Sequence, residues 1–187
     1  MSKPNVEGVH SDVKVVERPT RVKPYDVLLR FLAFTLTLVA TIIVAVDNQT
    51  KVISYAEMQF KATAKWEYMS AMVFFVVSNA IACSYAVISL VMMAMARSNG
   101  KEDVAVLVLT ALDLVMMALL FSANGAASAV GMIAQKGNSH VQWTKVCDVF
   151  DAYCRHITAA LVLSIIGSTT FLLLVLHSVL KLHYRST

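Results

Sequence analysis

Four long runs of apolar residues limit what this chain can fold into more than any other feature. They extend over residues 27–46, 69–96, 104–134 and 157–180. Each reaches the roughly 20 residues that a helix needs to cross about 30 Å of hydrocarbon. A segment inside a bilayer must satisfy its own backbone hydrogen bonds, so helices are expected although Val and Ile are frequent. The sequence therefore predicts an all-α membrane protein, a bundle of four transmembrane helices.

The composition excludes the other broad classes of protein. Hydrophobic residues make up 58% of the 187 residues and charged residues 15%, with a mean hydropathy of +0.66. Soluble domains are about 45–50% apolar and about 25% charged, and disordered chains are poor in apolar residues. The net charge of +4 is small and scattered along the chain, so we expect no nucleic-acid partner.

The basic residues favour one orientation. An even number of spans puts both termini on one side, and cytoplasmic loops carry an excess of Lys and Arg. Nine of these residues lie in residues 1–24, in the short turn 97–103 and in the last residues 181–187, against six in the loops 47–68 and 135–156. We therefore expect cytoplasmic termini, with residues 1–24 as a disordered tail and residues 181–187 as a second, short tail.

Two charged residues interrupt the apolar runs. Arg30 lies near the start of the first run and Asp113 lies nine residues into the third. Ionisable side chains inside a membrane are costly and usually face a partner. Because the third run is longer than the bilayer requires, the two side chains can reach the same depth. We predict a structural ion pair between them, the alternative being that Arg30 extends to the headgroups alone.

The third run also carries a stretch of small residues. Gly125 and Ala129, and likewise Ala127 and Gly131, are four residues apart, a spacing that lets helix backbones approach closely. The contact is expected inside the bundle, although an interface between protomers is an alternative.

The second long loop contains two cysteines, Cys147 and Cys154, on the expected outer side, where a disulfide can form. On a continuous helix their Cα atoms would be about 10.5 Å apart, too far for a bridge. Either the loop turns back and the disulfide forms, as we expect, or both cysteines stay free. With His140 and His156 they form a Cys2His2 set, but the spacing is not that of a zinc site.

Asn48 begins an Asn-Gln-Thr sequon just after the first run, so it is a candidate for N-glycosylation. No phosphate-binding loop, metalloprotease motif or nucleophile elbow is found in the sequence. We therefore predict no catalytic residue, no metal, no cofactor and no enzymatic activity.

Five segments together resemble one protein family. They are YDVLLRFLAF with Arg30, VDNQTK, SNAIACSYAVISL, LVLTALDLVMMALLFSANGAASAVG with Asp113, and GNSHVQWTKVCDVFDAYCRHITAAL with both loop cysteines. Over residues 25–180 the chain resembles the plant Casparian strip membrane domain protein (CASP) family, which is itself similar to the MARVEL four-helix proteins. The first loop, VISYAEMQFKATAKWEY, lacks the Pro-Phe-Phe element of the strip-forming members, so the resemblance is to the CASP-like branch.

The resemblance implies a plasma-membrane protein and assigns roles to some of its residues. Arg30 and Asp113 correspond to the family's hallmark pair, and Cys147 and Cys154 to its loop cysteines. It also implies homodimers, heterodimers or larger oligomers with related chains, acting as a non-enzymatic scaffold that guides local cell-wall modification by recruited enzymes. A small channel or transporter is the alternative, although the spans offer few polar groups and the sequence has no internal repeat.

Overall fold

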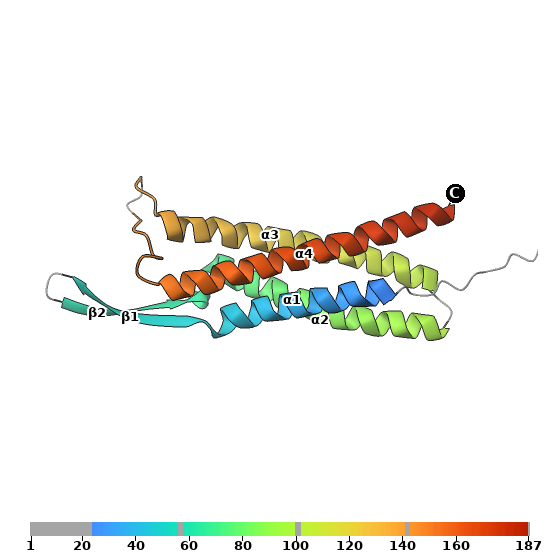
Figure 1. Cartoon of the computed structure of the whole chain (residues 1–187), viewed down its shortest axis with the longest axis horizontal. Helices are drawn as coiled ribbons and strands as arrows, with labels where there is room; N and C mark the ends of the chain where they lie inside the picture. The colour runs from blue at the N-terminus through green and yellow to red at the C-terminus, as the bar shows by residue number, and fades with distance from the viewer. Residues whose placement is uncertain (1–23, 56–57, 100–101, 141–142, 187) are drawn as a thin grey trace, which may run out of the picture.

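The computed structural model describes residues 24–55, 58–99, 102–140 and 143–186. The predicted disordered tail, residues 1–24, therefore lies outside the described residues except for Pro24. The elements follow in the order α1 (Pro24–Val46), β1 (Asn48–Tyr55), β2 (Met58–Lys65), a 3-10 turn η1 (Trp66–Tyr68), α2 (Ser70–Asn99), α3 (Glu102–Lys136) and α4 (Asp151–Ser186). All four α-helices are long and apolar enough to cross a membrane, as the sequence predicts (Figure 1).

The four helices form an elongated bundle in which each helix packs mainly on two others. α1 packs on α2 and α4, and α3 packs on the same two helices, so α1 and α3 lie diagonally across the bundle. One end of the bundle, here called the termini end, holds the start of α1 and the end of α4. The opposite end, the loop end, holds the hairpin and the connection from α3 to α4 (Figure 1).

Local sequence explains where the helices begin and end. Pro24 opens α1, where its missing N–H is no loss, and Asp26 follows in the first turn, where a carboxylate favours the helix dipole. α3 ends before Gly137, which adopts φ 67° and donates its N–H to the Ile133 carbonyl. A side chain at Gly137 would also meet the Trp143 carbonyl oxygen at 2.7 Å, so only glycine fits this turn.

All four helices are longer than the runs that predicted them, and α4 exceeds its run by the most. α4 begins at Asp151, six residues before the predicted span, and continues through the predicted C-terminal tail to Ser186. α3 continues to Lys136. The extra turns are polar, which a hydropathy pattern leaves out although a helix can continue beyond the hydrocarbon.

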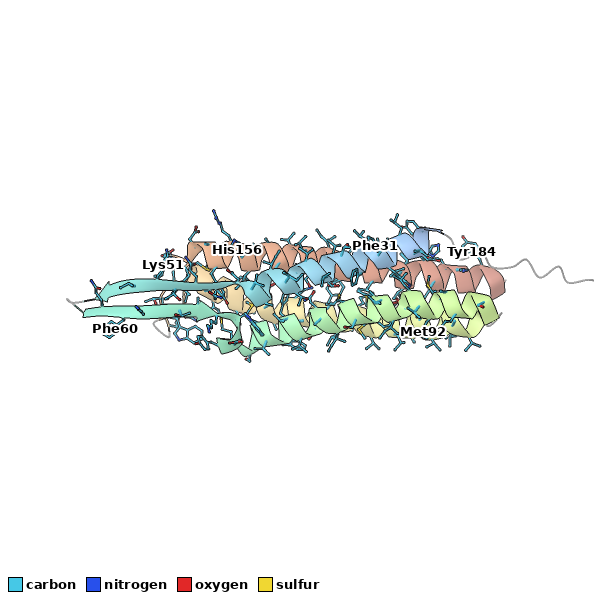
Figure 2. All side chains as sticks on the ribbon, turned by 90° about the horizontal axis from the view of Figure 1, so that it is seen from below. Phe31, Lys51, Phe60, Met92, His156 and Tyr184 are labelled. Carbon is cyan, nitrogen blue, oxygen red and sulfur yellow. A yellow bond between two sulfur atoms is a disulfide. The ribbon has the colours of Figure 1, made fainter. Side chains whose placement is uncertain are left out.

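The first long loop is not irregular. β1 and β2 form an antiparallel hairpin that pairs Asn48 with Lys65 at its base and Tyr55 with Met58 at its tip. It extends beyond the ends of the helices (Figures 1 and 2). Its base is attached to the bundle, because Trp66 Nε1 donates to the Ala45 carbonyl and the Tyr153 N–H donates to the Gln49 side-chain oxygen, both over 3.2 Å.

The interior of the bundle divides into two hydrophobic clusters. The termini-end cluster centres on Leu29, Tyr85, Leu120, Phe171 and Leu174. The loop-end cluster joins all four helices through the residues Val44, Met72, Phe75, Ala127, Phe150, Tyr153 and Ile157.

The outer surface carries exposed Leu, Ile, Val and Phe side chains, such as Phe31 and Val115 (Figure 2). Such a surface suits lipid and would be unfavourable in water.

Candidate functional site: an ion pair across the bundle

The structure brings Arg30 and Asp113 together in the centre of the termini half. Arg30 Nη1 lies 3.0 Å from Asp113 Oδ1, and Arg30 Nη2 lies 2.6 Å from Asp113 Oδ2. The side chains are only 4% and 0% exposed. Two parallel hydrogen bonds between a guanidinium and a carboxylate give this pair both strength and a fixed geometry. Because α1 and α3 are diagonal, the pair connects two helices that otherwise have little contact.

Tyr85 of α2 completes this cluster. Its hydroxyl lies 2.6 Å from Asp113 Oδ1 and 3.1 Å from the Leu109 carbonyl oxygen. Three helices therefore converge on one carboxylate. Tyr85 is not among the residues predicted from the sequence, although a signal is present: a tyrosine in the middle of a span has a hydroxyl that needs a partner once buried.

The arrangement suits a structural clamp better than a proton relay. An ionised carboxylate inside a membrane is tolerated when its charge is paired and its oxygens are hydrogen-bonded. Here both carboxylate oxygens accept hydrogen bonds from the Arg30 guanidinium, and one also accepts from Tyr85. A relay would need such groups to continue along the spans, whereas Asp26 and His177 lie near the termini end, in the first turn of α1 and near the end of α4.

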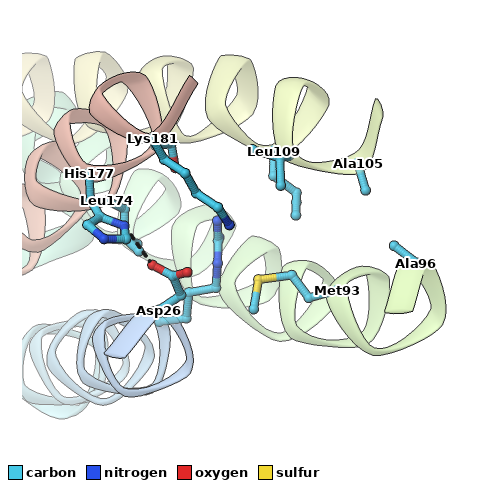
Figure 3. Close-up of a pocket in the computed structure, with 11 residues that line it drawn as sticks. Asp26, Met93, Ala96, Ala105, Leu109, Leu174, His177 and Lys181 are labelled. Atoms are coloured by element: carbon cyan, nitrogen blue, oxygen red, sulfur yellow. Dashed lines mark ion pairs between the residues drawn. The ribbon is translucent and has the colours of Figure 1, made fainter. Parts of the chain in front are cut away.

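A small pocket lies beside the pair, toward the termini end. Asp26, His177 and Lys181 line it together with Arg30, whose Nε has no hydrogen-bond partner among the described residues (Figure 3). Its volume is about 40 Å³, enough for a bridging water. The His177 Nδ1 lies 3.0 Å from Asp26 Oδ1. This contact connects α1 with α4, whereas the Arg30–Asp113 pair connects α1 with α3.

Buried polar side chains form a layer in the middle of the bundle. Ser164 donates to the Asn79 side-chain oxygen over 2.8 Å, connecting α4 with α2. Asn124 donates to the Ser168 hydroxyl over 2.9 Å, connecting α3 with α4. These groups bond across helix interfaces, so they fix the axial register of the helices.

The first predicted small-residue pair, Gly125 and Ala129, does not pack inside the chain, which corrects the expectation from the sequence for that pair. Of the four predicted residues, Ala127 is in the core and Gly131 is half-buried, whereas Gly125 and Ala129 are exposed. A Cβ added at Gly125 or Gly131 would meet no described atom within 4 Å. The close approach occurs at Gly167 of α4, where an added Cβ would lie 3.3 Å from the Thr37 side chain of α1. Because α3 is apolar on all sides, its sequence does not indicate which side of the helix faces the other helices and which side carries exposed small residues.

The loop cysteines are bridged. Cys147 lies in the segment before α4 and Cys154 in the first turns of the helix, with their Cα atoms 5.7 Å apart. The chain turns between them, which meets the condition that the sequence sets. Cys83 of α2 is unpaired and half-buried.

The loop end holds two further residues of interest from the sequence. His156 is not simply solvated, because its Nδ1 lies 3.1 Å from Asp47 Oδ1. Asn48 is exposed at the base of the hairpin, and the Thr50 hydroxyl of its sequon bonds to Thr63 over 3.0 Å.

Comparison with known sequences decides the family. Residues 19–170 match the Casparian strip membrane protein domain. The chain belongs to this family. It is similar to a CASP-like protein 1E1 from Vitis vinifera, with 52% identity over 99% of this chain and 96% of the relative.

Other CASP-like relatives support the same assignment. A CASP-like protein 1E2 from Glycine max is 49% identical over 97% of this chain and 100% of its own length. A CASP-like protein 1E1 from Arabidopsis thaliana is 37% identical over 97% of both chains. No solved structure matches the chain. The family is one of membrane proteins, in agreement with the four spans. It is not a known enzyme family.

Proposed function

We propose that this CASP-like protein is a non-enzymatic scaffold of the plasma membrane that assembles laterally into homo-oligomers and hetero-oligomers with related chains. The observation that carries the proposal is the exposed face of α3 with Gly125 and Ala129. In lipid, helices associate where small residues let two backbones approach closely. This small-residue face has no partner within the described chain, so a second protomer is its natural occupant.

The exposure of α3 as a whole also supports an interface between protomers on this helix. In the most apolar window of α3 only 17% of the residues are buried inside the chain, compared with 44% for α2. α3 is therefore the span with the most surface available for a neighbour. The contacts of Asp113 with Arg30 and Tyr85 also support an interface on α3. They attach the inner side of α3 to the bundle, while its outer side stays available to a second protomer.

We further propose that both termini are cytoplasmic, so that the hairpin, the disulfide and Asn48 face outward. The excess of Lys and Arg on the termini side supports this orientation. The chain belongs to the family of the Casparian strip membrane protein domain, and from the role that the sequence resemblance implies we propose local cell-wall modification, with wall-modifying enzymes as recruited partners. The projecting hairpin is the element of this chain best placed to contact them.

A channel or transporter has less support. Such a protein lines its route with polar groups, and here the central Asn and Ser side chains bond to one another across helix interfaces. We therefore assign the buried polar layer to helix register.

The scaffold is tested by replacing both small residues of the exposed face with a bulky one, Gly125→Ile with Ala129→Ile. A matched control is Ala80→Ile, an exposed position on α2. Single-molecule photobleaching in plant plasma membrane counts the subunits in each spot. We expect several steps per spot for the wild type and the control, and mainly one for the double variant. Unchanged step counts in the double variant would contradict the α3 interface.

A further inference from the structure

A second cavity lies at the loop end, in a region that the proposed scaffold does not use. Its volume is about 230 Å³, and it lies between α3, α4 and the start of α2. Its walls include the buried residues Met72, Tyr153 and Ile157. The disulfide between Cys147 and Cys154 borders it as well.

Gly131 is one reason for this space. It lines the cavity, and a Cβ built on it would meet no described atom within 4 Å. A larger residue could therefore be placed here without disturbing the neighbouring backbone. Packed interiors contain few voids larger than a water molecule, so a space of this size is unusual.

The cavity continues to the outside of the bundle. A groove along α4 shares Gln135, Thr158 and both bridged cysteines with it. From there the groove runs along Ala159 and Val162, which are exposed on the lipid-facing side of α4. An apolar chain in the bilayer could thus enter sideways beneath the disulfide.

The lining indicates the chemistry of the occupant. Met69, Met72 and Met132 offer flexible apolar side chains that adapt to chains of differing shape. An engineered cavity of about 150 Å³ holds one benzene molecule, so this cavity accepts a somewhat larger apolar group. The groove is also lined by the charged residues Asp151 and Arg155, which lie 4.0 Å apart and belong beside a zwitterionic headgroup rather than a hydrocarbon chain.

We propose that this cavity and groove form a binding site for one acyl chain of a lipid in the leaflet next to the disulfide. The chain enters at Thr158 and ends against Gly131, while the headgroup stays at the rim near Arg155. The site would couple the loop end of the protein to the surrounding lipid, independently of the α3 interface.

The test uses the full chain reconstituted in phosphatidylcholine vesicles that contain a trace of phosphatidylcholine with a diazirine on one acyl chain. After illumination, mass spectrometry locates the labelled residues. We expect label concentrated on buried cavity residues such as Met72, Tyr153 and Ile157. In Gly131→Phe this label should fall about tenfold, equivalent to about 1.4 kcal/mol of binding free energy. Label spread evenly over the lipid-facing surface would overturn the proposal.

Two further variants keep the result interpretable. Gly125→Phe adds the same ring to the other open glycine of α3, away from the cavity, and should leave the cavity label unchanged while it disturbs assembly. Thr158→Trp blocks the entry from an exposed position and should reduce the cavity label without changing assembly. Cavity label that persists in both Gly131→Phe and Thr158→Trp, with thermal stability preserved, would contradict an acyl-chain site.

Discussion

The two ends of the bundle are held together by different chemistry. At the termini end, the charged pair Arg30–Asp113 and the Tyr85 hydroxyl join three helices inside the bundle. At the loop end, a disulfide and a hairpin close the structure, and a cavity remains between the helices. A buried charge pair of this kind is specific, because each side chain would be left with a buried, uncompensated charge if the other were lost. The covalent bridge joins the segment before α4 to the first turns of that helix.

The largest effect should come from breaking the charge pair. Asp113→Leu leaves the Arg30 guanidinium buried without its counter-ion, which costs about 3–5 kcal/mol in proteins. We expect a much lower midpoint of thermal unfolding in detergent and little protein at the cell surface. Leu114→Ala, at an exposed neighbouring position, serves as the control and should unfold like the wild type. A midpoint in Asp113→Leu close to the wild type would contradict the clamp.

The disulfide should contribute less, and only at the loop end. The bridge closes a short loop and lowers the conformational entropy of the unfolded chain, which stabilises the folded state by about 2–3 kcal/mol. Cys147→Ser with Cys154→Ser should therefore lower stability by no more than this amount. Hydrogen exchange should accelerate in residues 143–158 while the termini end of α1 and α3 stays protected. Faster exchange around Arg30 would show that the two ends are not separate.

Tyr85→Phe should have a smaller effect than either. It removes one hydrogen bond to a charged oxygen, worth about 1.5 kcal/mol, but keeps both contacts of Arg30. The measurement is again the unfolding midpoint. Phe74→Leu, a change at an exposed position of the same helix, is a suitable comparison because it removes no hydrogen bond. A loss as large as that of Asp113→Leu would mean that Tyr85, rather than Arg30, holds the carboxylate.

The smallest effect is expected from Asp26→Asn at the termini end. The side chains of Asp26 and His177 are partly exposed, and pairs of this kind contribute about 0–1 kcal/mol. Asparagine keeps the shape and one acceptor, so the unfolding midpoint should barely move. A shift comparable to that of the disulfide variant would indicate that this contact carries part of the α1–α4 interface.

The parts of the molecule that the sequence predicts best are those inside the membrane. The four helices follow from run length, and Arg30 and Asp113 stand out because charges are rare in apolar runs. The hairpin is harder to predict, since an isolated pair of strands is marginal in water. It depends here on contacts at its base, through Trp66 and Gln49, that only the folded bundle provides.

The faces of the helices could not be predicted in the same way. A helix that is apolar on every side gives no signal for which side meets another helix and which meets lipid. For this reason the sequence places Gly125 inside the bundle, whereas the structure exposes it and uses Gly167 for the closest contact between α4 and α1. The contacts of His156 with Asp47 and of His177 with Asp26 could not be predicted either, because they form only when α1 and α4 pack side by side.

The most direct test of the clamp is a double-mutant cycle on Arg30 and Asp113. Stability is measured for Arg30→Met, Asp113→Leu and the combined variant in the same detergent. If the two side chains stabilise the bundle as a pair, removing both charges should cost less than the sum of the single changes, with a coupling of about 2–3 kcal/mol. A combined loss equal to the sum of the two single losses would contradict the account.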